Sequence, residues 1–156
     1  MKVKNFNKFI NESEDTKNVA GIAFVWDGKL LLVHPTNASW QHSALGIPKG
    51  GIKVGEDPLD AAIREVFEET GIEVDPSKLD SEPHTVPRFK KDGSIDSQMI
   101  YFIMRIDDPS DIGMIGHKID KEKLQLEEID WAGFVKIEDA YPKIHKSQLI
   151  ILDRVR

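Results

Sequence analysis

Residues 57–71 constrain the fold of this chain more than any other segment. Asp57 can cap a helix, Pro58 fits a first helical turn, and Gly71 stands where a left-handed C-terminal residue belongs. At about 100° per residue, the apolar side chains fall on one side of such a helix. This predicted core-facing stripe contains Leu59, Ala62, Ile63, Val66 and Phe67. The segment therefore predicts one amphipathic helix that packs on an apolar layer.

The same helix carries three acids on another face. Glu65, Glu68 and Glu69 are spaced i, i+3 and i+4, where like charges repel by about 0.2–0.5 kcal/mol per pair. Glu68 and Glu69 also lie toward the C-terminal end, which disfavours anions. One interpretation is a solvated acidic face that Arg64 partly neutralises. The other is a site for a hard cation such as Mg²⁺, which prefers oxygen ligands. The helix alone leaves both open.

The rest of the chain predicts strands in hairpin-like pairs around this helix. Asp27-Gly28 separates two β-rich runs and is a strong hairpin signal. We expect strands at Val19–Trp26, 29–34, 72–74, 85–89, 98–106 and 129–134, and a short extended piece at 45–48. We expect a loop at 107–123 and helical turns at Ile137–Ala140 and 145–155. The predicted fold class is therefore α+β or mixed α/β, with helices covering a sheet.

Size and composition narrow the function classes. The 156 residues suit one domain, which we place at 18–156 behind a flexible N-terminal arm at 1–17. No apolar run approaches the roughly 20 residues of a membrane span, and no export signal is evident. The absence of cysteine excludes disulfides and thiolate sites and fits the cytoplasm. The net charge of −6 argues against non-specific nucleic-acid binding.

A glycine-rich loop, 49–56, leads into the acidic helix. Glycines let the main chain approach a ligand closely. Gly50 and Glu56, followed by Arg64-Glu65-Val66-x-Glu68-Glu69-x-Gly71-Ile72, match the Nudix box at each specified position. The chain thus resembles the Nudix hydrolase family. The resemblance implies an α/β/α sandwich around a mixed sheet, and hydrolysis of a nucleoside diphosphate linked to another moiety.

The resemblance also implies roles for the box residues. Glu65, Glu68 and Glu69 would be metal ligands, with the Gly50 carbonyl as an additional oxygen. The metal would be Mg²⁺, with Mn²⁺ as an alternative. A bound Mg²⁺ neutralises phosphate charge and activates water. Two further residues would support the site: Arg64 would orient the glutamates, and Glu56 would brace the loop through Arg64.

The general base and the substrate contacts lie partly outside the box. Glu128, three residues before Trp131, lies where the resemblance places a later acid and is the preferred general base, with Glu127 and the box residue Glu65 as alternatives. We expect Lys49 to meet substrate phosphate. The five histidines show no ligand-like spacing and are interpreted as structural or exposed. Trp131 is expected in the core, and Trp40 either closes its loop or stacks on a base.

The expected substrate is a small-molecule nucleotide. The segment Pro48-Lys49-Gly50-Gly51 resembles that of dinucleoside polyphosphate hydrolases and RNA 5′-pyrophosphohydrolases. The resemblance therefore favours a dinucleoside polyphosphate or an RNA 5′-pyrophosphate, followed by ADP-ribose and other nucleotide sugars. The acidic net charge slightly disfavours long RNA, and we expect no membrane partner. The alternative function is a non-catalytic, nucleotide-sensing module, but such proteins typically lose box glutamates that this sequence keeps. Monomer and homodimer both stay open.

Overall fold

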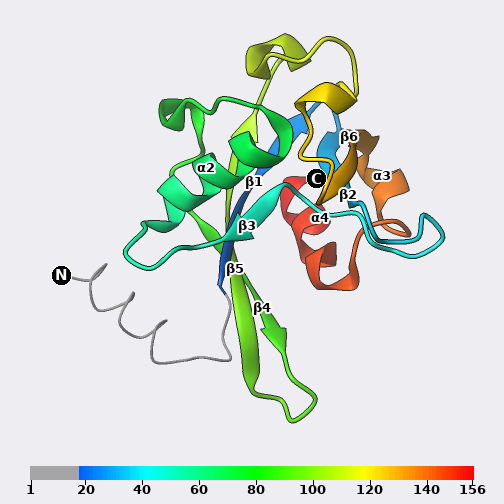
Figure 1. Ribbon diagram of the computed structural model, residues 1–156. Coiled ribbons are helices and arrows are strands. Elements are labelled where there is room, and N and C mark those ends of the chain that lie inside the picture. Colours follow the sequence, from blue (N-terminus) through cyan, green and yellow to red (C-terminus); the bar gives the residue numbers. More distant parts are fainter. Residues whose placement is uncertain (1–17) are drawn as a thin grey trace.

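The computed structural model describes residues 18–156, and the arm predicted at 1–17 lies outside the described residues. A six-stranded mixed sheet forms the centre of the molecule, with strand order β4-β5-β1-β2-β6 and β3 paired to β1 (Figure 1). The strands are β1 (Val19–Trp26), β2 (Lys29–Pro35), β3 (Lys49–Gly51), β4 (His84–Phe89), β5 (Ile95–Arg105) and β6 (Ile129–Lys136). The helices are α2 (Pro58–Thr70), α3 (Ile137–Ala140) and α4 (Leu149–Val155).

Strand β1 holds the sheet together. One edge pairs in parallel with β5 along nearly its whole length. The other edge is divided: its first residues pair with β3 and its last residues pair with β2, both antiparallel. Asp27 and Gly28 both have positive φ, of 47° and 71°, which matches the predicted two-residue hairpin. The divided edge brings the glycine-rich segment 49–51 onto the central strand.

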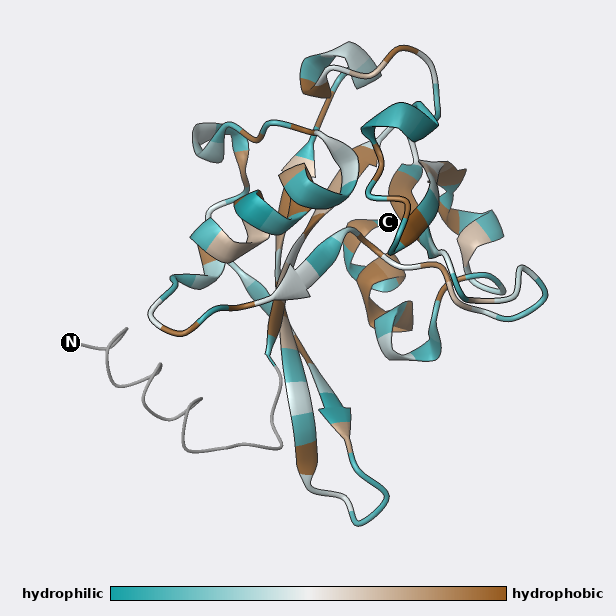
Figure 2. Ribbon diagram, viewed as in Figure 1, coloured by the Kyte–Doolittle hydropathy of each residue, from teal (hydrophilic) through white to brown (hydrophobic). Residues whose placement is uncertain are grey.

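Alternation along β1 produces three layers. Ala20, Ile22 and Phe24 point to the face that packs on α2, and Ala23 and Val25 point to the opposite face. On that second face, α3 and α4 contribute apolar residues to a separate core cluster. In Figure 2, hydrophilic residues colour the loop beyond β4, away from these two cores. The predicted α/β/α sandwich around a mixed sheet is confirmed.

Helix α2 begins and ends where the sequence predicts. The Asp57 carboxylate accepts a hydrogen bond from the Leu59 N–H at 3.0 Å, and Gly71 ends the helix with a φ of 77°. The predicted apolar stripe is wrong at one position, because the Phe67 side chain is 51 % exposed. The acidic face also divides, because Glu69 is buried whereas Glu68 is exposed.

Two segments that the sequence predicts to be extended, 72–74 and 45–48, form no strand in the structure. Residues 72–74 form no strand, although Ile72 is buried in the core that faces α2. The left-handed Gly71 turns the chain away from the sheet, so Ile72 fills the core without pairing. The extended piece at 45–48 makes only isolated bridges, and β3 begins at Lys49. The predicted loop at 107–123 contains two short 3-10 turns, Pro109–Ile112 and Lys121–Lys123.

Two further 3-10 turns lie at Pro76–Lys78 and Lys146–Gln148. The second turn takes the first part of the helix predicted at 145–155 and leads directly into α4. None of the helices within residues 18–156 has both the length and the apolar character needed to cross a bilayer.

Candidate active site

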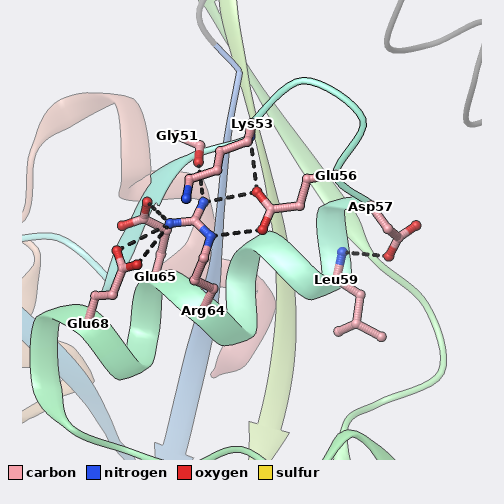
Figure 3. Close-up of polar contacts among 8 residues, drawn as sticks. All are labelled: Gly51, Lys53, Glu56, Asp57, Leu59, Arg64, Glu65 and Glu68. Atoms are coloured by element: carbon pink, nitrogen blue, oxygen red, sulfur yellow. Dashed lines mark hydrogen bonds and ion pairs between the residues drawn. The ribbon is translucent and has the colours of Figure 1, made fainter.

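Arg64 ties the glycine-rich loop to helix α2 (Figure 3). Its guanidinium donates two hydrogen bonds to the Glu56 carboxylate, at 2.8 and 2.9 Å, and one to the Gly51 carbonyl at 2.9 Å. It also donates to Glu65 at 2.8 Å and to both Glu68 oxygens at 3.2 Å. The hydrogen bond from Arg64 lowers the pKa of Glu56, and the pKa of Arg64 is raised in return. One cation therefore holds three carboxylates and one carbonyl in fixed positions.

Gly50 is required by the position of Glu65. A Cβ added at residue 50 would collide with the Glu65 carboxylate, which occupies the space where a side chain would lie. Residue 50 also pairs with Ala20 on β1, so the backbone cannot easily retreat. The absence of a side chain therefore allows the α2 carboxylate to lie directly against the β3 backbone.

Glu69 differs from the other acids of α2 because it is buried, with 5 % of its surface exposed. The pKa of Glu69 is raised to about 8, chiefly by burial. The charge of Lys49 and a 3.2 Å hydrogen bond from the Lys49 N–H lower this pKa, and the charges of Glu65 and Glu128 raise it further. The charges of two other carboxylates thus act on Glu69, and Lys49 is the cation that opposes them there. Such an arrangement favours the entry of a positive charge.

A divalent cation fits this set of donors. Hard cations prefer carboxylate and carbonyl oxygens, and Glu65, Glu69 and the backbone beside Gly50 supply them together. Within residues 18–156, no three side chains of His, Asp or Glu already converge as ligands of one ion. Glu65 and Glu68 instead accept hydrogen bonds from Arg64.

The segment before β6 brings Glu128 to the same place. The Gln125 N–H donates to the backbone carbonyl of Glu69 at 3.2 Å, and the Glu128 N–H donates to the Gln125 carbonyl at 2.9 Å. On its other side, the Glu128 carbonyl accepts from the Thr36 N–H at 2.8 Å. These bonds fix an otherwise exposed acid close enough to raise the pKa of Glu69.

A basic pocket of about 180 Å³ adjoins the carboxylates. Lys49, Arg88 and His145 line it, together with apolar residues of β2 and β6 and the buried Gln148. Burial lowers the pKa of His145, and the charges of Arg88, Lys146 and Lys49 lower it further. Two positive groups, Lys49 of β3 and Arg88 of β4, therefore meet here beside the His145 ring. Sequence reasoning missed His145, since no spacing pattern links it to Lys49 or Arg88.

Trp131 lies at the margin of the core rather than inside it. It is half-buried and packs against the cluster that faces α3 and α4. The reason is its place on β6, the edge strand of the sheet, opposite His34.

Comparisons with known proteins agree with this architecture. A family model described as the NUDIX domain matches residues 16–154. The RNA pyrophosphohydrolase of Brucella anthropi is 42 % identical over 55 residues, which are 35 % of this chain and 30 % of that protein. The RNA pyrophosphohydrolase of Rhizobium meliloti is 48 % identical over 48 residues, 31 % of this chain and 29 % of that protein. The matches thus span less than a third of these relatives.

Solved structures share the fold over most of the chain. A Caenorhabditis elegans Ap4A hydrolase in a binary complex aligns with a TM-score of 0.62 and 21 % identity, covering 88 % of this chain and 93 % of that one. A MutT NUDIX hydrolase from Burkholderia pseudomallei aligns with a TM-score of 0.64 and 17 % identity, covering 90 % and 98 %. Together with the family match over nearly all described residues, these findings show that the chain belongs to the Nudix family.

Proposed function

We propose that this protein is a Nudix pyrophosphohydrolase that cleaves a phosphoanhydride bond of a nucleotide with the help of Mg²⁺ or Mn²⁺. One observation carries the proposal. A buried carboxylate, Glu69, lies among Glu65, Glu128 and the Gly50 backbone, directly beside a basic pocket. A cation site next to a phosphate site is the arrangement that phosphoryl chemistry needs.

Glu65, Glu68, Glu69 and the Gly50 carbonyl would hold the cation. When bound, a divalent cation neutralises phosphate charge and makes water a stronger nucleophile. Glu69 supplies a fixed carboxylate, because its Lys49 hydrogen bond and its burial allow little movement. Glu68 is exposed, and within residues 18–156 its hydrogen bonds come from Arg64 alone, so it is free to exchange that contact for the cation. A solved structure of a bifunctional NMN adenylyltransferase/ADP-ribose pyrophosphatase from Francisella tularensis is 15 % identical to this chain in sequence. That structure contains AMP and a Mn ion.

Arg64 and Glu56 are positioning residues in this proposal. The two-bond contact between them fixes the guanidinium, which in turn fixes the orientation of Glu65. Arg64 remains charged throughout, because its carboxylate partners raise its pKa. Glu56 braces the loop further by accepting a hydrogen bond from the Lys53 N–H at 3.0 Å.

Glu128 is the proposed general base. Its backbone is anchored on both sides, and its charge acts on Glu69, whereas its side chain stays exposed to water. An accessible carboxylate beside the proposed cation site is suited to take a proton from water. Glu127 and Glu65 remain the alternatives that variants must separate.

The substrate would place phosphates in the basic pocket. Lys49 lies between the carboxylates and the basic pocket, because its backbone N–H donates a hydrogen bond to Glu69 and Lys49 also lines the pocket. The pocket is small, which suits phosphates rather than a whole nucleotide. We favour an RNA 5′-pyrophosphate or a dinucleoside polyphosphate over ADP-ribose. The matched relatives are named RNA pyrophosphohydrolases, and one structural neighbour is an Ap4A hydrolase.

Phosphate release with Mg²⁺ and with EDTA tests the proposal. The panel contains 5′-triphosphorylated RNA, diadenosine tetraphosphate, ADP-ribose and nucleoside triphosphates. We expect cation-dependent turnover of one class, and the first two are favoured. Turnover that survives EDTA would contradict the cation site. If the folded protein binds these compounds but cleaves none, the non-catalytic nucleotide-sensing function replaces the hydrolase.

A further inference from the structure

A second and larger cavity opens beside β6, the edge strand of the sheet, where residues of β2, α3 and the loop that carries Trp40 also line it. Its volume of about 540 Å³ lies within the usual range of small-molecule sites. His34 and Leu45 line this cavity, whereas Val33, Pro35 and Gly46 line the basic pocket. Among residues 18–156, the two cavities share no lining residue, and no carboxylate of α2 lines the larger one.

Trp40 forms a fixed aromatic surface in this cavity. The buried His34 ring is held by Asp130, with 2.6 Å between Nδ1 and Oδ1, and Trp40 stacks on that ring at 3.8 Å with an interplanar angle of 1°. Trp131 meets Trp40 edge-on at 5.8 Å. Despite these contacts, Trp40 is 59 % exposed. Since His34 covers one ring face, the opposite face is presented to solvent and available for stacking.

The loop that carries Trp40 is anchored near a lysine. The Ser43 hydroxyl donates to the Pro142 carbonyl at 2.7 Å, and the Leu45 N–H donates to the Lys143 carbonyl at 3.0 Å. The two segments therefore lie side by side at the mouth of the cavity. An anchored loop loses little conformational freedom when a ligand binds, which favours affinity.

Positive charge surrounds this cavity, although the chain as a whole is acidic at −6. Three lysines and one carboxylate line it: Lys29, Lys136, Lys143 and Asp139. Lys29 is already paired with Asp27 at 3.3 Å. Lys136 and Lys143 form no ion pair with any residue between 18 and 156. The cavity thus combines a stacking surface with more lysines than carboxylates, which suits an aromatic ligand that carries a negative charge.

We propose that this cavity binds a nucleoside monophosphate, with the base stacked on the exposed face of Trp40 and the phosphate next to Lys143. Base stacking on an aromatic side chain and phosphate contact with a lysine are the two interactions that the lining residues offer. The site breaks no bond and needs no divalent cation. It therefore goes beyond the proposed hydrolase and stands without it.

Titration calorimetry with AMP in EDTA tests this site, with ribose 5-phosphate as the base-free probe. EDTA removes divalent cations, so binding through the carboxylate cluster is suppressed. We expect saturable binding of AMP, and binding of ribose 5-phosphate at least about tenfold weaker because it cannot stack. Equal affinity for the two probes would overturn the stacking role of Trp40.

Variants locate the binding. Trp40→Ala should weaken AMP binding at least about tenfold, whereas Trp40→Phe, which keeps an aromatic face, should retain most of it. Phe89→Ala is the matched control, because Phe89 is also an exposed aromatic residue, at 63 %, but lies on β4. Glu65→Gln should bind AMP like the wild type. Unchanged binding in Trp40→Ala, or loss of binding in Glu65→Gln, would contradict the proposal.

Discussion

The carboxylate cluster and the basic pocket meet at Lys49 but are held in different ways. The carboxylates of Glu56, Glu65 and Glu68 come from one loop and one helix, and Arg64 fixes them through its hydrogen bonds, whereas Glu69 accepts its hydrogen bond from the Lys49 N–H. The basic groups Lys49, Arg88 and His145 come from three distant segments and only line a common pocket. The first region carries excess negative charge and the second excess positive charge. In the function proposed above, the first region would attract a cation and the second would attract phosphate.

The substitution Glu69→Gln tests the role of the carboxylate cluster and has the largest expected effect. We expect kcat to fall by orders of magnitude, because the variant loses the buried carboxylate of the cation site. The fold should persist, since glutamine resembles the protonated form that the raised pKa of about 8 already favours. Steady-state kinetics with Mg²⁺ and thermal unfolding measure the two effects. Glu73→Gln is the matched control, because Glu73 is exposed beyond the end of α2. If the Glu69→Gln variant is as active as the Glu73→Gln variant, Glu69 is not part of the site.

The next largest effect is expected for Glu128→Gln. General bases typically contribute about 10²- to 10⁴-fold, so kcat should fall by about that factor. Cation affinity should change little, because Glu128 lies in the segment just before β6 and is not one of the proposed cation ligands on α2. Rapid-quench kinetics and Mn²⁺ titration separate these quantities. The neighbouring Glu127→Gln serves as control, and a slow Glu127→Gln beside a normal Glu128→Gln would transfer the base to Glu127.

Arg88→Gln probes the phosphate side. It should raise KM about tenfold and leave kcat nearly unchanged, since one charged hydrogen bond to phosphate contributes about 1.5–3 kcal/mol. The increase should shrink at high salt, where exposed charges are screened. Lys90→Gln, at an exposed residue just beyond β4, is the control. A fall in kcat with KM unchanged would mean that Arg88 acts on the carboxylate cluster instead.

The smallest effect concerns stability and pH in the absence of metal. Glu69 has a pKa raised from 4.5 to about 8, so the folded protein binds this proton more tightly than the unfolded chain. The resulting stabilisation is full below pH 4.5 and is lost as pH rises through 8, by at most about 1.4 kcal/mol per pH unit. The Tm of the wild type relative to Glu69→Gln should therefore fall by several degrees across this window. A difference that does not vary with pH would refute the buried, protonatable state of Glu69.

The sequence predicts the carboxylate half of the site because its information is local. Helix periodicity, the Asp57 cap and the Gly71 end place Glu65 and Glu68 on one face, and the structure has the same cap and end. Periodicity alone failed for Glu69 and Phe67. Which of the two is buried depends on where α2 lies against β1 and β3, and this is a tertiary property.

In the basic half, the sequence singled out Lys49, but it did not join Arg88 and His145 to it, for the same reason. Arg88 and His145 are 57 positions apart in the numbering, and no periodic pattern joins a β4 residue to the turn before α4. The failed strand at 72–74 shows a related limit. Apolar residues such as Ile72 can fill a core without pairing in a sheet, and composition does not distinguish the two.

The divided edge of β1 also has a consequence for the order in which the molecule folds. β3 pairs with the start of β1, and the same residues of β1 pair with β5, where Val19 lies opposite Met99. Contacts of such long sequence separation form slowly, because a long loop must close first. The residues of the Nudix box are neighbours along the chain, but the part of the sheet on which they lie is complete only after β5 has paired with β1. Catalytic competence should therefore appear late during refolding, together with the last long-range pairing.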